Sequence, residues 1–217
     1  METILEYLDK GGWMMYVILA VSILGVTVFL ERAFDLFIRR RLDARGLLST
    51  VLGQVEGRQF RRAIDACKVA SRHPLVGVLR AGIMRANRRE KEIERAMERE
   101  MVQALPGLQK RVGLLGFLAN SCTLLGLLGT IFGLITAFAS VSEASAAARQ
   151  QALADGIAQA MYTTAFGIVV AVPLLYFHHL LSERVDGVLN EMEGGATALL
   201  VAMTGAVEAP ADGQKAE

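Results

Sequence analysis

The residues of this chain that could support chemistry are small or carry hydroxyl groups, and they recur at helical spacing in two apolar stretches. On a helix of 3.6 residues per turn, one face of the first stretch carries Thr123, Gly126, Thr130, Gly133 and Ala137. One face of the second stretch carries Ala160, Thr163, Thr164, Gly167 and Ala171. This pattern favours close packing of membrane helices, with Gly129 and Gly133 as a GxxxG pair, and a narrow polar path for an ion is the alternative.

Neither stretch contains a carboxylate or a permanently charged side chain. Residues 112–142 and 156–182 have no Asp, Glu, Lys or Arg. A proton relay inside a membrane normally needs a titratable group, and a threonine hydroxyl does not ionise near neutral pH. If the chain conducts protons, the carboxylate must therefore come from a second protein.

Three long uncharged stretches determine the expected fold class. Residues 11–30, 112–142 and 156–182 each reach the roughly 20 mainly apolar residues that a membrane-spanning helix needs. We expect an all-α, polytopic membrane protein with transmembrane helices at 13–30, 112–142 and 156–182. The second stretch is longer than a bilayer requires, so it should tilt or project beyond the hydrocarbon. Acidic residues precede the first stretch and Glu31–Arg32 follows it, which indicates a retained anchor rather than a cleaved signal peptide.

The distribution of Lys and Arg predicts the orientation. Lys10 alone precedes the first span, whereas Arg32, Arg39–Arg41 and Arg45 follow it, and the segment 143–155 contains only Arg149. The positive-inside rule then places the N-terminus and a 143–155 loop in the periplasm, and residues 31–111 and the C-terminus in the cytoplasm. Arg39–Arg41 are interpreted as topology determinants that contact lipid headgroups.

The segments outside the membrane are expected to be helical. Residues 1–12 form a short amphipathic segment, 31–111 a cytoplasmic helical region and 183–207 an amphipathic C-terminal helix, while 208–217 read as a disordered tail. Pro74 should start a helix after His73, and Pro106–Gly107 should kink the chain before the second span.

Several functional classes are excluded by composition and motif. The formal net charge of +1 does not favour nucleic-acid binding. Cys67 and Cys122 are interpreted as small packing residues, because two distant cysteines make neither a disulfide scaffold nor a zinc site. No nucleotide-binding motif, metal cluster or catalytic triad is visible, so we expect neither an enzyme nor a cofactor.

Two motifs resemble the MotA/TolQ/ExbB proton channel family, and ExbB most closely. Residues 123–138 (TLLGLLGTIFGLITAF) are similar to the second-span signature of that family, and residues 156–173 (GIAQAMYTTAFGIVVAVP) to its third-span signature. Residues 11–16 (GGWMMY) and 30–32 (LER) also resemble ExbB. With the topology, the likeness covers nearly the whole chain.

The resemblance implies an inner-membrane motor subunit. Such proteins form a ring-shaped homo-oligomer, usually a pentamer, around the single membrane helices of ExbD/TolR-like partners that each carry one essential Asp. Protonation of that Asp from outside and its release inward are thought to rotate ring against partner, and a TonB- or TolA-like protein passes the work to the outer membrane. This fits the carboxylate missing from the spans.

By position, the resemblance implies that Thr130 and Thr164 face the partner Asp, with Thr123, Thr163 and Gln159 along the same ion path. The small residues Gly126, Gly129, Gly133 and Gly167 would serve packing, and Pro173 matches the third-span proline, where a kink can shape the exit. Gln159 departs from the Glu of many members, and an amide cannot exchange protons. Residues 120–122 also depart from the Ala-Pro often found there.

Other interpretations stay open from the sequence. His178 and His179 read first as interfacial side chains, with a proton acceptor at the inner exit as the functional alternative. The chain could be a passive scaffold for a partner helix or a flagellar-type stator subunit, although stators carry a fourth span. A secondary transporter would need internal repeats, which are not visible. TonB-type uptake, a Tol-Pal-type role as in TolQ, and H⁺ or Na⁺ as the ion are not distinguished.

Overall fold

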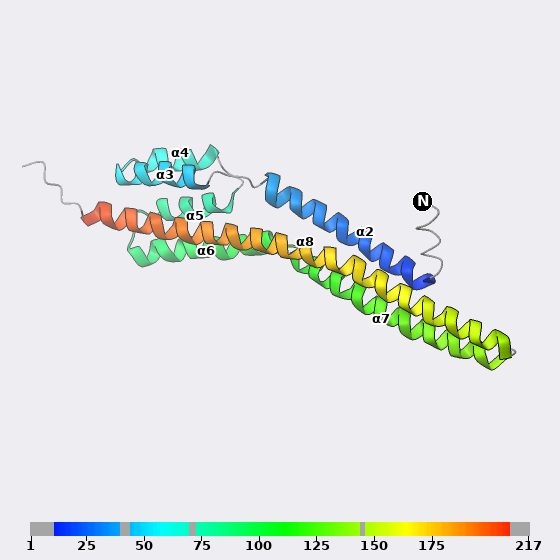
Figure 1. The fold of residues 1–217 in the computed structure, drawn as a ribbon. Helices are drawn as coiled ribbons and strands as arrows, with labels where there is room; N and C mark the ends of the chain where they lie inside the picture. Colours follow the sequence, from blue (N-terminus) through cyan, green and yellow to red (C-terminus); the bar gives the residue numbers. More distant parts are fainter. Residues whose placement is uncertain (1–10, 40–43, 70–72, 144–145, 209–217) are drawn as a thin grey trace, which may run out of the picture. The chain divides into compact units, whose positions relative to one another are not determined.

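The computed structural model describes residues 11–39, 44–69, 73–143 and 146–208. Every regular element in these ranges is a helix, which confirms the all-α prediction (Figure 1). The predicted segment at 1–10 and the tail beyond Glu208 lie outside the described residues. The chain divides into two compact units, one of Met1–Arg32 and Arg111–Leu181 and the other of Ala33–Lys110 and Ser182–Glu217.

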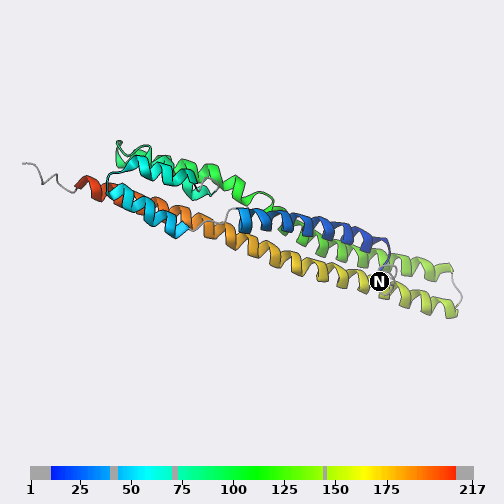
Figure 2. The same cartoon turned by 90° about the horizontal axis from the view of Figure 1, so that it is seen from above.

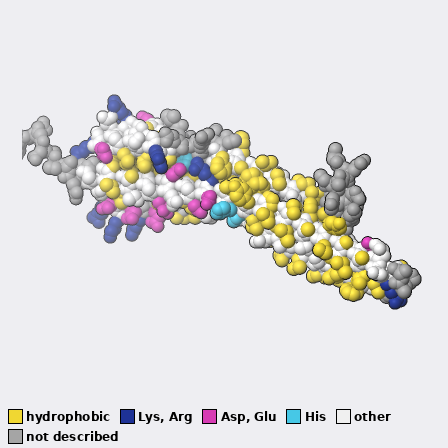
Figure 3. Space-filling view, viewed as in Figure 1, with side chains coloured by type: hydrophobic (Ala, Val, Ile, Leu, Met, Phe, Trp, Pro, Cys, Tyr) yellow, Lys and Arg dark blue, Asp and Glu magenta, His cyan; other side chains and the backbone are white. Residues whose placement is uncertain are grey.

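The first unit is built from α2 (Trp13–Ala33), α7 (Val112–Glu143) and the first part of α8 (Ala146–Glu208). Three helical stretches of the described chain are long and apolar enough to cross a membrane, namely Trp13–Phe37, Glu90–Val141 and Ala148–Gly205. Apolar side chains gather on the visible surface of the first unit (Figure 3). The three predicted spans are thus present as candidate membrane helices.

Aromatic and glycine contacts fix α2 against the other two helices of its unit. The rings of Phe29 and Phe177 stack with centroids 4.0 Å apart, and Trp13 meets Phe132 edge-on at 5.6 Å. A Cβ at Gly25 would lie 2.7 Å from Leu174 Cδ2, so this glycine lets α8 approach α2 closely. In both views α2 runs alongside α8, as these contacts require (Figure 1 and Figure 2).

The helix boundary near the second span differs from the prediction. Helix α6 (Glu90–Gln109) continues through Pro106, and the break lies at Lys110 and Arg111. Arg111 has φ 61°, a left-handed conformation that interrupts the repeating backbone hydrogen bonds of a helix. The Arg111 guanidinium donates to both carboxylate oxygens of Glu31, which ties the start of α7 to the end of α2.

The predicted loop at 143–155 and the separate helix at 183–207 also need correction. Helix α8 starts at Ala146 and runs without interruption to Glu208, through Pro173. Residues 146–155 are rich in Ala, Gln and Arg, which have high helix propensity, so a polar connection of this composition stays helical. The loop was expected because this segment, bounded by Glu143 and Asp155, separates two long uncharged stretches.

The second unit packs short helices onto the C-terminal part of α8. It contains a π-helical turn (Phe34–Arg39), α3 (Ala44–Glu56), α4 (Phe60–Val69), α5 (Pro74–Ile83) and α6. The predicted apolar stripe on α8 is buried at Val185, Val188, Met192, Ala196, Leu199 and Met203. Cys67 is buried too, and this burial raises the pKa of its thiol, opposed by the charge of Arg80.

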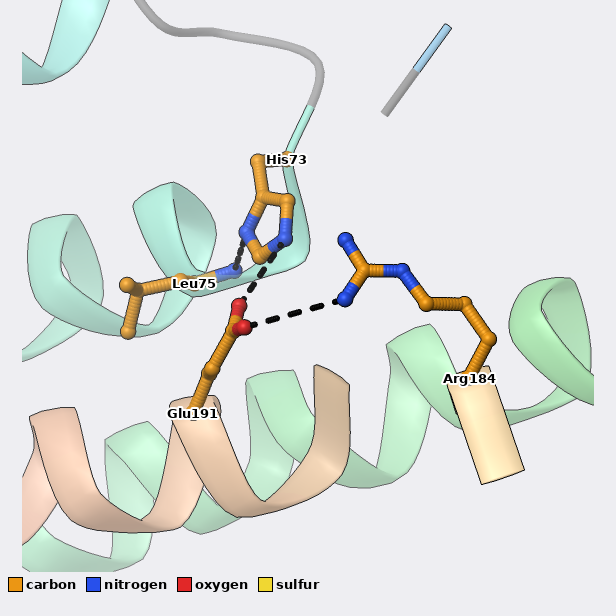
Figure 4. Close-up of polar contacts among 4 residues, drawn as sticks. All are labelled: His73, Leu75, Arg184 and Glu191. Atoms are coloured by element: carbon orange, nitrogen blue, oxygen red, sulfur yellow. Dashed lines mark hydrogen bonds and ion pairs between the residues drawn. The ribbon is translucent and has the colours of Figure 1, made fainter. Parts of the chain in front are cut away.

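A buried histidine links α5 to α8 inside this unit (Figure 4). The Leu75 backbone N–H donates to Nδ1 of His73 at 3.3 Å, so His73 caps α5 and the predicted start at Pro74 is confirmed. The Nε2 atom of His73 lies 3.5 Å from the carboxylate of Glu191 on α8, and Arg184 approaches the other carboxylate oxygen at 4.0 Å. These contacts fix the start of α5 on α8.

Candidate functional site

The small residues of α7 and α8 form a seam in which the two backbones nearly touch. A Cβ at Gly126 would lie 3.3 Å from the Gly167 Cα, and a Cβ at Gly167 would lie 2.8 Å from the carbonyl oxygen of Cys122. Further along, a Cβ at Gly133 would lie 3.0 Å from Ala160. Larger side chains would push the helices apart, so the packing interpretation of this pattern holds within the protomer.

Thr163 and Thr164 have different surroundings although they are neighbours. Thr164 is half-buried, and its hydroxyl lies 3.2 Å from the Gly126 carbonyl on α7 and 3.4 Å from the Ala160 carbonyl on its own helix. Thr163 is fully buried and donates to the Gln159 carbonyl at 2.7 Å, with the Gly11 carbonyl at 3.4 Å. Its methyl group touches the backbone region of Gly129, so Thr163 packs where three segments meet.

Two threonines of α7, Thr123 and Thr130, are less enclosed than Thr163. Thr130 is half-buried and its hydroxyl donates to the Leu127 carbonyl of the same helix at 2.6 Å. Thr123 is exposed on the protomer surface. These two side chains are therefore open to a second chain, in contrast to Thr163.

A polar pocket of about 670 Å³ lies where α7 ends and α8 begins, and the sequence pattern did not reveal it. It is lined by Thr136, Ala137, Ser140, Ala152, Asp155, Gly156, Ala158, Gln159 and Tyr162. The Gln151 amide donates to the Asp155 carboxylate at 3.0 Å. Gln159 thus lines a solvent-accessible pocket that also contains a carboxylate. The i, i+4, i+7 spacing of Asp155, Gln159 and Tyr162 was the signal that could have identified this pocket.

At the other end of the seam, His178 packs against a glycine. A Cβ at Gly116 would lie 3.2 Å from both Cδ2 and Nε2 of the half-buried His178 ring. His179 and Pro173 are exposed. The geometry gives His178 a packing partner on α7, and a role in proton release stays a prediction.

Comparison with known proteins connects this geometry to a family. Residues 54–194 match the profile of the MotA/TolQ/ExbB proton channel family. A putative biopolymer transport protein ExbB homolog of Methanothermobacter thermautotrophicus is 27% identical over 194 residues, which cover 88% of this chain and 67% of that protein. The biopolymer transport protein exbB1 of Vibrio cholerae is 27% identical over 199 residues, covering 89% and 85%.

A third relative matches a shorter region at higher identity. The Tol-Pal system protein TolQ of Haemophilus influenzae is 36% identical over 94 residues, or 43% of this chain and 41% of that protein. The matched profile covers well over half of the chain and includes both polar span helices and the seam between them. The chain belongs to the MotA/TolQ/ExbB proton channel family.

Proposed function

We propose that this protein is the ring-forming inner-membrane subunit of a proton-driven motor. An ExbD/TolR-like single-span partner would contribute the membrane Asp, and the pair would energise a TonB- or TolA-like protein. The proposal rests on the residues of the two span segments in this member of a proton channel family. Residues 112–142 and 156–182 contain hydroxyl groups but no carboxylate. One proton crossing 100 mV supplies about 2.3 kcal/mol, so useful work needs several protons or a repeated cycle.

The site residues take roles that follow from their exposure. Thr130 and Thr164, both half-buried, would hydrogen-bond the partner Asp or the water beside it. Thr123 and Gln159 would line the approach, whereas Thr163 would hold the seam together. Under the positive-inside rule, the pocket at Asp155 and Gln159 opens toward the periplasm and His178 lies toward the cytoplasm.

An ExbB-like role is favoured over a TolQ-like role. The named ExbB relatives align with 88% and 89% of this chain, whereas TolQ aligns with 43%. We therefore propose energised outer-membrane transport as the process, with envelope maintenance as the alternative.

Proton flux into liposomes tests the proposal. The protein would be reconstituted alone and with its Asp-bearing partner, as wild type and with Thr130→Ala or Thr164→Ala. We expect flux only with the partner, and a reduction of about tenfold or more in either variant because the hydroxyl no longer positions the carboxylate. Thr27→Ala is the matched control, since Thr27 is an exposed α2 residue bonded only to its own helix.

Three results would contradict the proposal or part of it. Flux from this chain alone would show that the carboxylate is not supplied by a partner. Full flux in both threonine variants would show that Thr130 and Thr164 do not position the partner carboxylate. Full energised transport with no proton flux at all would support a passive scaffold instead.

A further inference from the structure

An open groove of about 390 Å³ runs between α6 and α8 in the second unit. Its lining combines an apolar floor with an acidic rim: Glu94, Met97, Glu98, Met101, Glu193, Ala196, Thr197 and Leu200. Val102 and Val201, next to lining residues in the sequence, are 63% and 65% exposed. Exposed apolar side chains outside the spans expected from the sequence, 13–30, 112–142 and 156–182, indicate a surface that a protein partner covers.

Helix α6 carries two charged stripes of opposite sign. The acidic stripe is Glu90, Glu94 and Glu98, and the basic stripe is Lys91, Arg95 and Arg99, each with strict four-residue spacing. All six side chains are exposed, and none forms an ion pair with another residue in the part of the chain that the structure describes. Figure 3 shows acidic side chains (magenta) and basic side chains (dark blue) next to one another on the surface of this unit.

Each stripe lacks a counter-charge at the position where a helix normally supplies one. Like charges at i and i+4 repel along a helix, whereas opposite charges there stabilise it. The stripes do oppose each other at i, i+3, as in Lys91–Glu94, but those contacts do not close into ion pairs here. Both stripes are therefore available to a second molecule.

We propose that a second copy of this chain covers the groove and that the basic stripe of that copy is the group that enters it. Arg95 and Arg99 of one copy would face Glu94, Glu98 and Glu193 of the next, with their aliphatic stems over Met97 and Met101. The contact is heterologous, because the acidic and basic surfaces are different faces of one helix, and such contacts form the ring of the proposed function when the rotation between copies closes. This inference rests on the ring in the proposed function and assigns its cytoplasmic interface.

The register of the contact follows from symmetry. Rotation about an axis parallel to α6 leaves every residue at its own height, so equivalent residues of neighbouring copies lie level. Glu94 and Arg95 differ by one residue, or about 1.5 Å of helical rise, and Glu98 and Arg99 by the same amount. The two stripes therefore meet with almost no axial shift.

A second copy explains both stripes together, which other occupants do not. A basic peptide would satisfy the acidic groove but leave Lys91, Arg95 and Arg99 without counter-charges. Anionic lipid would satisfy those three residues and leave the groove empty. Only a chain that presents both surfaces satisfies both.

Cross-linking between two tagged forms of the full-length protein tests the contact. In a Cys67→Ala, Cys122→Ala background, one form carries Glu98→Cys and the other Arg99→Cys, the pair that the register places level. We expect oxidation of the co-expressed mixture in membranes to give a disulfide between the two different tags and none between identical tags. An intact oligomer without mixed-tag disulfide, or with identical-tag disulfides only, would overturn the proposal.

Charge reversal gives a second, independent test. Glu94→Arg with Glu98→Arg, or Arg95→Glu with Arg99→Glu, should abolish the oligomer in detergent, and the fourfold combination should restore it. The control Arg45→Glu with Arg61→Glu reverses two exposed charges on α3 and α4 and should leave assembly intact. Circular dichroism would establish that each variant is folded; equal loss in the control, or oligomers in both reversed variants, would overturn the proposal.

The two proposals fail in different ways. An oligomer that is cross-linked as expected but carries no protons would contradict the motor function and leave this interface standing. An oligomer that conducts protons with its partner but never cross-links at 98 and 99 would contradict this interface alone.

Discussion

The buried stripe of helix α8 consists mostly of small side chains in the first unit and of large apolar side chains in the second. In the first unit the stripe is mostly small, with Gly156, Ala160, Thr163, Gly167 and Ala171 against α7. In the second unit the same three- and four-residue spacing continues with larger residues, at Val185, Val188, Met192 and Leu199. One periodicity thus supports two kinds of contact, set by side-chain size.

The solvent explains this difference. Where the outer surface faces lipid, apolar side chains gain nothing by moving inside, so the helices associate through close backbone approach. Where the outer surface is charged, burial of Leu, Val and Met drives packing in the usual way. The change in residue size along α8 therefore marks the change of environment.

The largest expected effect comes from adding one methyl group to the seam. Gly167→Ala would place a Cβ 2.8 Å from the Cys122 carbonyl oxygen, which belongs to the backbone and cannot rotate away. We expect a loss of about 1–3 kcal/mol in stability, measured by thermal denaturation in detergent. Gly194→Ala lies on the same helix in open space, so its methyl should be tolerated or stabilise by about 0.5–1 kcal/mol.

Equal melting temperatures for these two variants would contradict the proposed difference between the small-residue packing of the first unit and the large-residue packing of the second. A milder loss for Gly167→Ala would show that the two helices can separate slightly at the seam. The control shares the helix, the residue change and the helical backbone conformation, so only the neighbouring atoms differ.

A smaller effect is expected where the second unit depends on a polar contact. His73→Ala removes the acceptor for the Leu75 backbone N–H and the neighbour of Glu191. Loss of such a helix cap costs about 0.5–2 kcal/mol, measured by chemical denaturation. His73→Asn should recover part of this loss because its carbonyl can accept the same bond; no recovery would show that the ring's packing dominates.

Much of this fold could be predicted from the sequence because the signals were local. Uncharged length identified the three candidate spans, and the Pro74 start and the α8 stripe follow from proline chemistry and helical period. The break at Arg111 could not be predicted, because nothing about an arginine signals a left-handed backbone. The helical start of α8 was not predicted, because residues 143–155 separate two uncharged stretches and were expected to form a loop, although they include good helix formers.

The site was predicted less completely, because sequence spacing gives the face of a helix but not its neighbour. Thr163 and Thr164 are adjacent, yet only the structure shows that Thr163 is enclosed and Thr164 reaches the Gly126 carbonyl. The pocket at Asp155 requires the end of α7 to lie beside the start of α8. Such proximity between separate helices is a tertiary property.

The smallest effect concerns the buried thiol of the second unit. Because burial raises the pKa of Cys67, its reactive thiolate should form at higher pH than in an exposed cysteine, and iodoacetamide should modify it slowly near neutral pH. The reference is Thr50→Cys on the exposed face of α3 in a Cys67→Ala background. By linkage, the buried neutral thiol contributes its full stability below the pKa of the unfolded thiol. This contribution is lost as the pH rises from that pKa through the higher pKa of the folded thiol. Equal labelling rates at positions 67 and 50 between pH 7 and about 9 would show that the second unit opens readily. Its packing would then be looser than the large buried residues of α8 imply.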